Sequence, residues 1–178
     1  MSQAYNLIAP LDESQLCNLK VGDKVLLNGI IYTARDAAHK RIVEALENKQ
    51  TLPFPLKNQI IYYVGPAPAK PGTVIGSAGP TTSCRMDPYT PILLEKGLKA
   101  MIGKGPRSDE IVESIKKNRA IYFVTVGGAA AVTAQAIKKV QVIAYSGLGP
   151  EAIHKLTIKN LPAFVAIDIF GNNIFNQK

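Results

Sequence analysis

The sequence predicts an α/β fold in which a parallel β-sheet is buried on both faces. From residue 100 onward, continuous apolar segments such as 120–126 alternate with segments whose apolar residues have helical spacing. This alternation is typical of buried parallel strands covered by helices. The chain has 178 residues, of which 47% are hydrophobic and 19% are charged, a profile that fits one globular domain. We therefore expect a single domain over residues 1–178.

The first third of the chain follows this alternation less closely. The elements expected before residue 100 are, in order, an extended lead-in with one short helix capped by Asp12 (1–20), a strand with a glycine irregularity (24–32), a helix that stops before Pro53 (from 33), a strand (60–64), a Pro/Gly-rich loop (65–80) and a helix (87–96). Thr33, with Asp36 three positions later, is a variant of the capping box. Asp87 followed by Pro88 is typical of a helix start. Because long loops are uncommon in compact domains, the 65–80 loop is expected to serve function.

The second half is regular. Its expected elements are a strand (100–103), a helix capped by Ser108 (109–118), a strand (120–126), a helix (129–138), a strand (140–145), a helix (150–156) and a last strand (163–169). The Gly-rich turn at 126–131 is assigned to close packing, because it lacks the spaced glycines of a dinucleotide-binding motif.

Composition excludes several kinds of protein. No apolar run is long enough to cross a bilayer, and the N-terminus lacks the features of a signal peptide, so a cytoplasmic location and no membrane association are expected. Two cysteines, Cys17 and Cys84, are too few to hold an iron–sulfur cubane, and they form no C-x-x-C pair. With His39 and His154 as the only histidines, we expect no metal site made by this chain alone.

The formal net charge of +8 indicates an anionic partner. Nucleic acid is a common interpretation of such an excess, but the basic residues form isolated doublets and no aromatic RNA-binding motif accompanies them. A small dianionic substrate or an acidic partner subunit explains the same charge, so no nucleic-acid partner is expected. The rival hypothesis of another class is a non-catalytic basic module that binds an anion or RNA.

Three segments contain residue types that a plain core does not require. In residues 32–41, Arg35 and His39 are four apart and share one face at the start of a helix, where backbone N–H groups attract anions. In residues 75–87, small residues precede a run of hydroxyl and thiol side chains that ends in Arg85. In residues 101–108, Lys104 lies between two glycines at the end of a strand, where open parallel sheets place ligands. A plain structural interpretation of each segment is a capped helix or a turn-rich connection.

Together these segments resemble a known family. The stretches T-A-R-D-A-A-H-K-R, G-S-A-G-P-T-T-S-C-R-M-D and G-K-G occur here in that order. They are similar to the β subunit of two-subunit class I fumarate hydratases and L-tartrate dehydratases, which is equivalent to the C-terminal domain of single-chain class I fumarases. The resemblance runs from about Leu11 to Phe175. It implies a swivelling β/β/α domain, with three layers and a central parallel sheet.

The resemblance also implies roles for individual residues. Thr81 is the expected catalytic base, His39 has an expected active-site role, and Arg35, Arg85 and Lys104 are the expected ligands of the substrate carboxylates. A [4Fe-4S] cluster would be held by three cysteines of a partner α subunit, with one iron open as a Lewis acid, in an α2β2 assembly. The form of the first stretch favours fumarate and malate over tartrate as substrates, with an L-tartrate dehydratase β subunit as the alternative.

Overall fold

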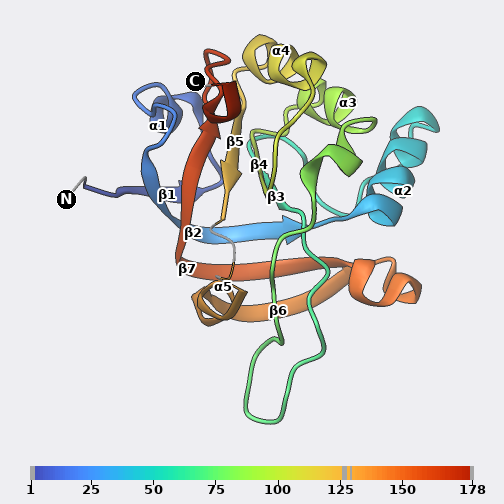
Figure 1. Cartoon of the computed structure of the whole chain (residues 1–178). Coiled ribbons are helices and arrows are strands. Elements are labelled where there is room, and N and C mark those ends of the chain that lie inside the picture. The colour runs from blue at the N-terminus through green and yellow to red at the C-terminus, as the bar shows by residue number, and fades with distance from the viewer. Residues whose placement is uncertain (1–2, 126–127, 129, 177–178) are drawn as a thin grey trace.

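The computed structural model describes residues 3–125, 128 and 130–176 of the chain. Its strands are β1 (Tyr5–Ala9), β2 (Lys24–Thr33), β3 (Ile60–Tyr62), β4 (Ala100–Gly103), β5 (Ile121–Val124), β6 (Ile137–Ala144) and β7 (Ile153–Ile167). Its helices are α1 (Glu13–Leu16), α2 (Asp36–Glu47), α3 (Thr90–Glu95), α4 (Asp109–Lys117) and α5 (Ala130–Ala136), with 3₁₀ turns η1 (Ser83–Met86), η2 (Ser146–Glu151) and η3 (Ile174–Asn176). Figure 1 shows α2, α3 and α4 gathered on one side of β3, β4 and β5.

The strands form one mixed, seven-stranded sheet. β1 to β5 lie parallel in chain order. β7 then pairs antiparallel with β5, β6 and β2. The pairing therefore runs in a closed circuit, from β2 through β3, β4, β5 and β7 back to β2. This closure removes the open edges that β2 and β5 would otherwise have.

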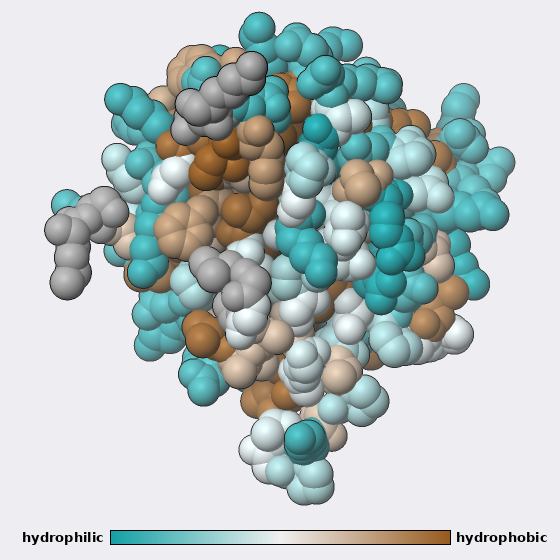
Figure 2. All heavy atoms as spheres, in the orientation of Figure 1, coloured by the Kyte–Doolittle hydropathy of each residue, from teal (hydrophilic) through white to brown (hydrophobic). Residues whose placement is uncertain are grey.

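The central strands are buried on both faces because alternate side chains enter two different cores. On β3, Ile60 and Tyr62 belong to the core inside the strand circuit, whereas Ile61 and the next residue after the strand, Tyr63, pack toward the helices. The amphipathic α4 shows the complementary pattern, with Ile111, Val112 and Ile115 buried on its inner face. Hydrophilic residues cover the outward side of α2, α3 and α4 in Figure 2, while hydrophobic residues are visible over β1, β5 and β7.

The expected sheet of parallel strands is correct for β2 to β5 and wrong for the last two strands, which pair antiparallel. The helix predicted at 150–156 is also wrong, because β7 begins at Ile153 and runs without interruption to Ile167. Its buried positions alternate through His154, Leu156 and Ile158, and both of its sides are hydrogen-bonded to other strands. Pairing partners distant in sequence thus override the local signal.

Two predicted helix starts are wrong, and two are confirmed. Thr33 is the last residue of β2, and its buried hydroxyl accepts from the backbone N–H of His154 at 3.0 Å. The helix predicted from Asp87 begins at Thr90 instead. Asp12 caps α1 and Ser108 caps α4, each by accepting a backbone N–H from the following turn, as predicted.

Three further observations complete the fold. The expected lead-in is extended, but it also contributes β1, which pairs with β2. The Gly-rich turn predicted at 126–131 and the end of the predicted strand 120–126 lie largely outside the described residues. Within the described part of the chain, no helix has both the length and the apolar character needed to cross a bilayer.

Candidate active site

The predicted site residues follow three neighbouring parallel strands. Arg35 comes two residues after the end of β2, and Lys104 comes directly after β4. Between them, β3 leads into Tyr63, whose carbonyl accepts the backbone N–H of Thr81 at 2.7 Å. Because the carboxyl ends of parallel strands share one edge of a sheet, the chain brings all three predicted motifs to the same edge.

Arg35 and Arg85 come together around one carboxylate, that of Asp36. Arg85 Nε donates to Asp36 Oδ1 at 2.9 Å, and Arg35 Nε lies 3.9 Å from Asp36 Oδ2. Arg35 Nε also lies 3.9 Å from Glu151 Oε1 in η2. Since Arg85 uses Nε for Asp36, its two terminal nitrogens remain available for a bidentate bond to another carboxylate.

Part of this polar cluster lacks hydrogen-bond partners. Arg35 Nε and Asp36 Oδ2 are both buried and form no hydrogen bond, because 3.9 Å exceeds hydrogen-bond range. Arg35 reaches this position by crossing Gly65, where an added Cβ would lie 3.0 Å from Arg35 Nη1. Buried polar atoms are rarely left unpaired, so the cluster retains one unused donor, Arg35 Nε, and one unused acceptor, Asp36 Oδ2.

Thr81 and Lys104 lie on adjacent backbone segments. Thr82 and Lys104 form a parallel β-bridge. Ser83 N–H donates to the Lys104 carbonyl at 3.0 Å, and Lys104 N–H donates to Ser83 Oγ at 3.0 Å. Gly103 permits this approach, since a Cβ there would lie 1.9 Å from Ser83 Oγ. Thr81 is partly buried and Lys104 is exposed. No described contact joins Thr81 or Lys104 directly to Arg35 or Arg85. What these residues share is their position at the carboxyl edge of the sheet.

His39 lies beneath this edge and not on its surface. Its side chain is fully buried on α2, and Nδ1 lies 2.8 Å from the Arg35 carbonyl oxygen. The carbonyl can only accept, so Nδ1 carries the proton and Nε2 holds a lone pair. Nε2 is buried without a hydrogen-bond partner. The ring packs edge-on against Tyr63, with centroids 5.4 Å apart.

The surroundings of His39 keep its ring neutral. Burial is the main cause that lowers the pKa of His39 to about 4, and the positive charge of Arg107 lowers it further. The hydrogen bond with the Arg35 carbonyl acts in the opposite direction but does not offset burial. His39 is thus placed to hold the backbone of Arg35 in position.

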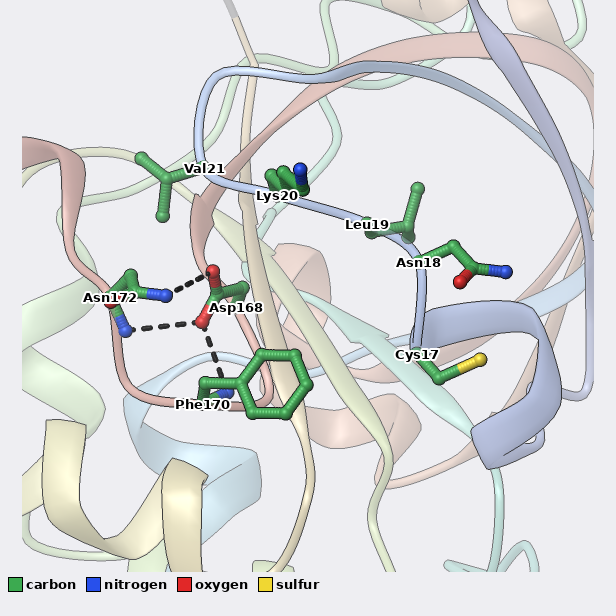
Figure 3. A pocket seen from close by; sticks show the side chains of 8 residues that line it. All are labelled: Cys17, Asn18, Leu19, Lys20, Val21, Asp168, Phe170 and Asn172. Atoms are coloured by element: carbon green, nitrogen blue, oxygen red, sulfur yellow. Dashed lines mark hydrogen bonds between the residues drawn. The ribbon is translucent and has the colours of Figure 1, made fainter.

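None of the hollows described on the surface is lined by these residues, although one of about 440 Å³ reaches Pro66 and Pro150, which adjoin Gly65 and Glu151. One of about 460 Å³ is lined by Cys17 to Val21 together with Asp168, Phe170 and Asn172. Figure 3 shows that the Asp168 carboxylate forms hydrogen bonds within its own turn. It accepts from Asn172 Nδ2 at 2.9 Å and from the backbone N–H groups of Phe170 and Asn172. This hollow therefore presents no unpaired carboxylate to a ligand.

Comparison with known proteins agrees with the three motifs. The family described as Fumarase C-terminus matches residues 2–178. The chain belongs to this family. It is 40% identical over 176 residues to the aerobic class I fumarate hydratase of Escherichia coli K12 and 38% identical over 180 residues to fumarate hydratase 2 of Leishmania major. It is also 39% identical over 183 residues to a candidate L(+)-tartrate dehydratase subunit beta of Methanocaldococcus jannaschii.

Coverage differs between these members of the Fumarase C-terminus family. The alignments include 97% and 99% of this chain but only 32% of each of the two fumarate hydratases. For the Methanocaldococcus protein they include 99% of this chain and 92% of the relative. The chain thus spans about a third of the length of the fumarate hydratases and nearly the whole of a separate subunit.

Class I fumarate hydratases are iron–sulfur enzymes, and the described residues of this chain do not fit a cluster. No group of three or more His, Cys, Asp or Glu side chains among them could hold a metal ion. Cys17 and Cys84 are both free and exposed, and they lie in different parts of the fold, next to α1 and within η1. A cubane cluster needs several thiolates at one place.

The sequence did not identify every residue of the site. Asp36, interpreted as part of a capping box, instead pairs with Arg85, and Arg107 was given no role although it is buried behind the edge. Periodicity gives no signal for either residue, because ion pairs between distant segments leave no local pattern. The five predicted residues all lie at or under one edge of the sheet.

Proposed function

We propose that this chain is the β subunit of an iron–sulfur hydro-lyase that interconverts (S)-malate with fumarate and water. The observation that supports this most is the gathering of Arg35, Arg85, Lys104 and Thr81 at the carboxyl edge of β2, β3 and β4. Three cations and one hydroxyl at a single edge match the needs of a dicarboxylate substrate. Membership of the Fumarase C-terminus family supports the same reaction class.

The cations would bind the substrate and stabilise developing charge. Removing a proton next to a carboxylate turns a dianion into something close to a trianion, so positive charge must surround it in the transition state. Arg85, whose two terminal nitrogens are not used by Asp36, is suited to bind a carboxylate through two parallel bonds, and Arg35 would add a second guanidinium charge beside it. Lys104 would add a third, more mobile positive charge from the neighbouring strand end.

Thr81 is the proposed base. A threonine hydroxyl is a weak base unless nearby positive charge lowers its pKa, and Lys104 lies on the segment that is bridged to the next residue, Thr82. The bond from Thr81 N–H to the Tyr63 carbonyl fixes the backbone of this residue against β3. We propose that His39 contributes to the site through Arg35, whose carbonyl it holds.

The remaining parts of the enzyme would come from a partner. We propose that the [4Fe-4S] cluster belongs to an α subunit equivalent to the other two-thirds of the fumarate hydratases, in an α2β2 assembly in the cytoplasm. When bound, such a cluster supplies a Lewis acid for the substrate hydroxyl. The closed strand circuit with α2, α3 and α4 on one side supports a swivelling β/β/α arrangement for this chain. The single-domain assignment to residues 1–178 also remains part of the proposal.

The choice between malate and tartrate is open to a direct assay. The chain assembled anaerobically with its α subunit should dehydrate (S)-malate and hydrate fumarate with a higher kcat/KM than it shows for L-tartrate. A preference for tartrate would establish the alternative assignment as a tartrate dehydratase β subunit. Salt-sensitive binding of RNA by the isolated chain, with no hydro-lyase activity in any assembly, would favour the basic-module hypothesis instead.

A further inference from the structure

Arg107 is a buried arginine behind the candidate site. Its side chain is 0% exposed. Nε donates to Asp87 Oδ1 at 2.7 Å, and Nη2 donates to Thr90 Oγ1 at 2.9 Å. The guanidinium carbon also lies 5.4 Å from the ring centroid of Tyr63 and 5.0 Å from that of Tyr122, both within cation–π range. Replacing such a buried ion pair with apolar residues is often neutral or stabilising, so stability alone does not account for it.

The ion pair joins the two segments that carry the proposed substrate cations. Asp87 directly follows the 3₁₀ turn that contains Arg85, and its second oxygen accepts from Ser108 N–H at 3.1 Å. Arg107 lies three residues after Lys104. The Asp87 carboxylate therefore bridges the Arg85 segment to the Lys104 segment through both of its oxygens.

Tyr122 links the same two segments a second time. Its hydroxyl lies 2.8 Å from Ser83 Oγ and 2.9 Å from the Gly105 carbonyl oxygen. The ring of Tyr122 faces the guanidinium of Arg107. A displacement of Arg107 would thus move Tyr122 and, through its hydroxyl, the segments that contain Ser83 and Gly105.

The other aromatic contact of Arg107 reaches the remaining site residues. Tyr63, over which the guanidinium lies, accepts the N–H of Thr81 with its carbonyl oxygen. The Tyr63 ring packs against His39. Arg107 accordingly contacts a residue that holds the proposed base, although its own side chain is fully buried.

We propose that Arg107 is a positioning residue: with Asp87, it fixes the Arg85 and Lys104 segments relative to one another without touching substrate. The inference rests on the proposed function, because it assigns these segments to dicarboxylate binding. It predicts that loss of the Arg107 fork raises KM more than it lowers kcat, since the carboxylate ligands are carried on the two segments that Arg107 joins directly.

The test uses the enzyme assembled with its α subunit and three variants of this chain. Arg107→Lys keeps the charge but loses the planar fork. The double variant Asp87→Asn/Arg107→Met leaves no unpaired buried charge and should unfold within a few degrees of wild type. Arg119→Met is the control, because Arg119 also pairs with a carboxylate, that of Glu13, and also lies over a ring, that of Phe170.

We expect KM for malate to rise at least tenfold in Arg107→Lys and in the double variant, and to stay within twofold of wild type in Arg119→Met. A folded double variant with wild-type KM would show that Arg107 only stabilises the fold, and would overturn the inference. If the double variant does not fold, KM for malate is measured for Arg107→Lys at a temperature where its circular dichroism spectrum matches that of wild type. A KM within twofold of wild type would then overturn the proposal. An inactive wild-type assembly overturns the proposed function and this inference together, whereas an active wild type with unaffected variants overturns this inference alone.

Discussion

Asp36 resolves a problem of charge at the candidate site. Two arginines on one edge repel each other unless an anion lies between them, and the Asp36 carboxylate occupies that place. It leaves the terminal nitrogens of Arg85 free, and it leaves Arg35 Nε without a hydrogen bond. The site is thus held together before any substrate binds, yet it retains donors for one.

The fork geometry of the two arginines predicts a strong effect of conservative substitution. Arg35→Lys and Arg85→Lys keep the positive charge but cannot form a bidentate bond to a carboxylate. In the assembled enzyme we expect each to lower kcat/KM at least ~10²-fold, or roughly 2.7 kcal/mol. Steady-state kinetics with malate measure this loss. Activity within about twofold of wild type in both variants would contradict their role as carboxylate ligands.

Thr81 is the residue on which the proposed proton transfer depends. Thr81→Ala should abolish exchange of solvent deuterium into C3 of malate while leaving assembly and iron content unchanged. Thr81→Ser should retain more exchange, because it loses a methyl group and not the hydroxyl. Thr82→Ala is the neighbouring control, since Thr82 is exposed. Wild-type exchange by Thr81→Ala, measured by NMR at matched iron content, would exclude Thr81 as the base.

The buried, neutral His39 predicts a pH dependence of stability. The pKa of His39 is lowered to about 4 in the folded chain, whereas the unfolded value is about 6.5. As pH falls through this window the unfolded chain takes up the proton first, so the free energy of unfolding should fall by up to about 3 kcal/mol. Urea unfolding of wild type and His39→Gln between pH 7 and 4 checks this. The variant should show a shallower decline; parallel curves would refute the assignment.

At the scale of elements, the close packing of the 81–83 segment against the end of β4 determines where the site residues lie. Gly103, at the end of β4, lets the 81–83 segment lie directly against the strand, because any Cβ there would meet Ser83 Oγ at 1.9 Å and Tyr63 Cδ2 at 3.0 Å. Ser83 is itself buried and hydrogen-bonded. It cannot move aside without breaking contacts that position Lys104.

Gly103→Ala should therefore destabilise the isolated chain by about 1–3 kcal/mol, as overpacking of a core does. Adding Ser83→Ala removes the oxygen in closest contact and should recover part of that loss. Gly147→Ala is the matched control, because no atom lies within 4 Å of a Cβ at that position. Thermal or urea unfolding measures all three. A Gly103→Ala variant as stable as the Gly147→Ala variant would show that the segments have room to separate.

The elements also show what sequence reasoning can predict. The motifs around Arg35, Arg85 and Lys104 were recognised because their residues are contiguous, and the caps at Asp12 and Ser108 because capping is local. The start of α2 was misplaced because Thr33 finds its hydrogen-bond partner in β7, 121 residues away. Long-range hydrogen bonds of this kind leave no trace in local spacing.

At the scale of the whole molecule, the same distinction applies to the sheet. The parallel direction of β2 to β5 follows from alternating apolar strands and helices, and it was predicted, whereas β1 was expected only as part of an extended lead-in. The closure of the sheet by β7 was not, because it depends on pairing with three strands whose residues lie throughout the chain. The cations of the site lie at the carboxyl edge of the parallel strands. Among the described residues, no group of side chains near this edge or elsewhere could hold a metal ion.

The central claim is that this chain supplies the substrate ligands and the base to an enzyme completed by another chain. The most direct measurement is hydratase activity of this chain, of its α subunit and of their anaerobic mixture reconstituted with iron and sulfide. We predict that this chain alone is colourless, free of iron and inactive on malate and fumarate, that the α subunit alone is inactive, and that the mixture is active. A brown, active preparation of this chain by itself would contradict the account.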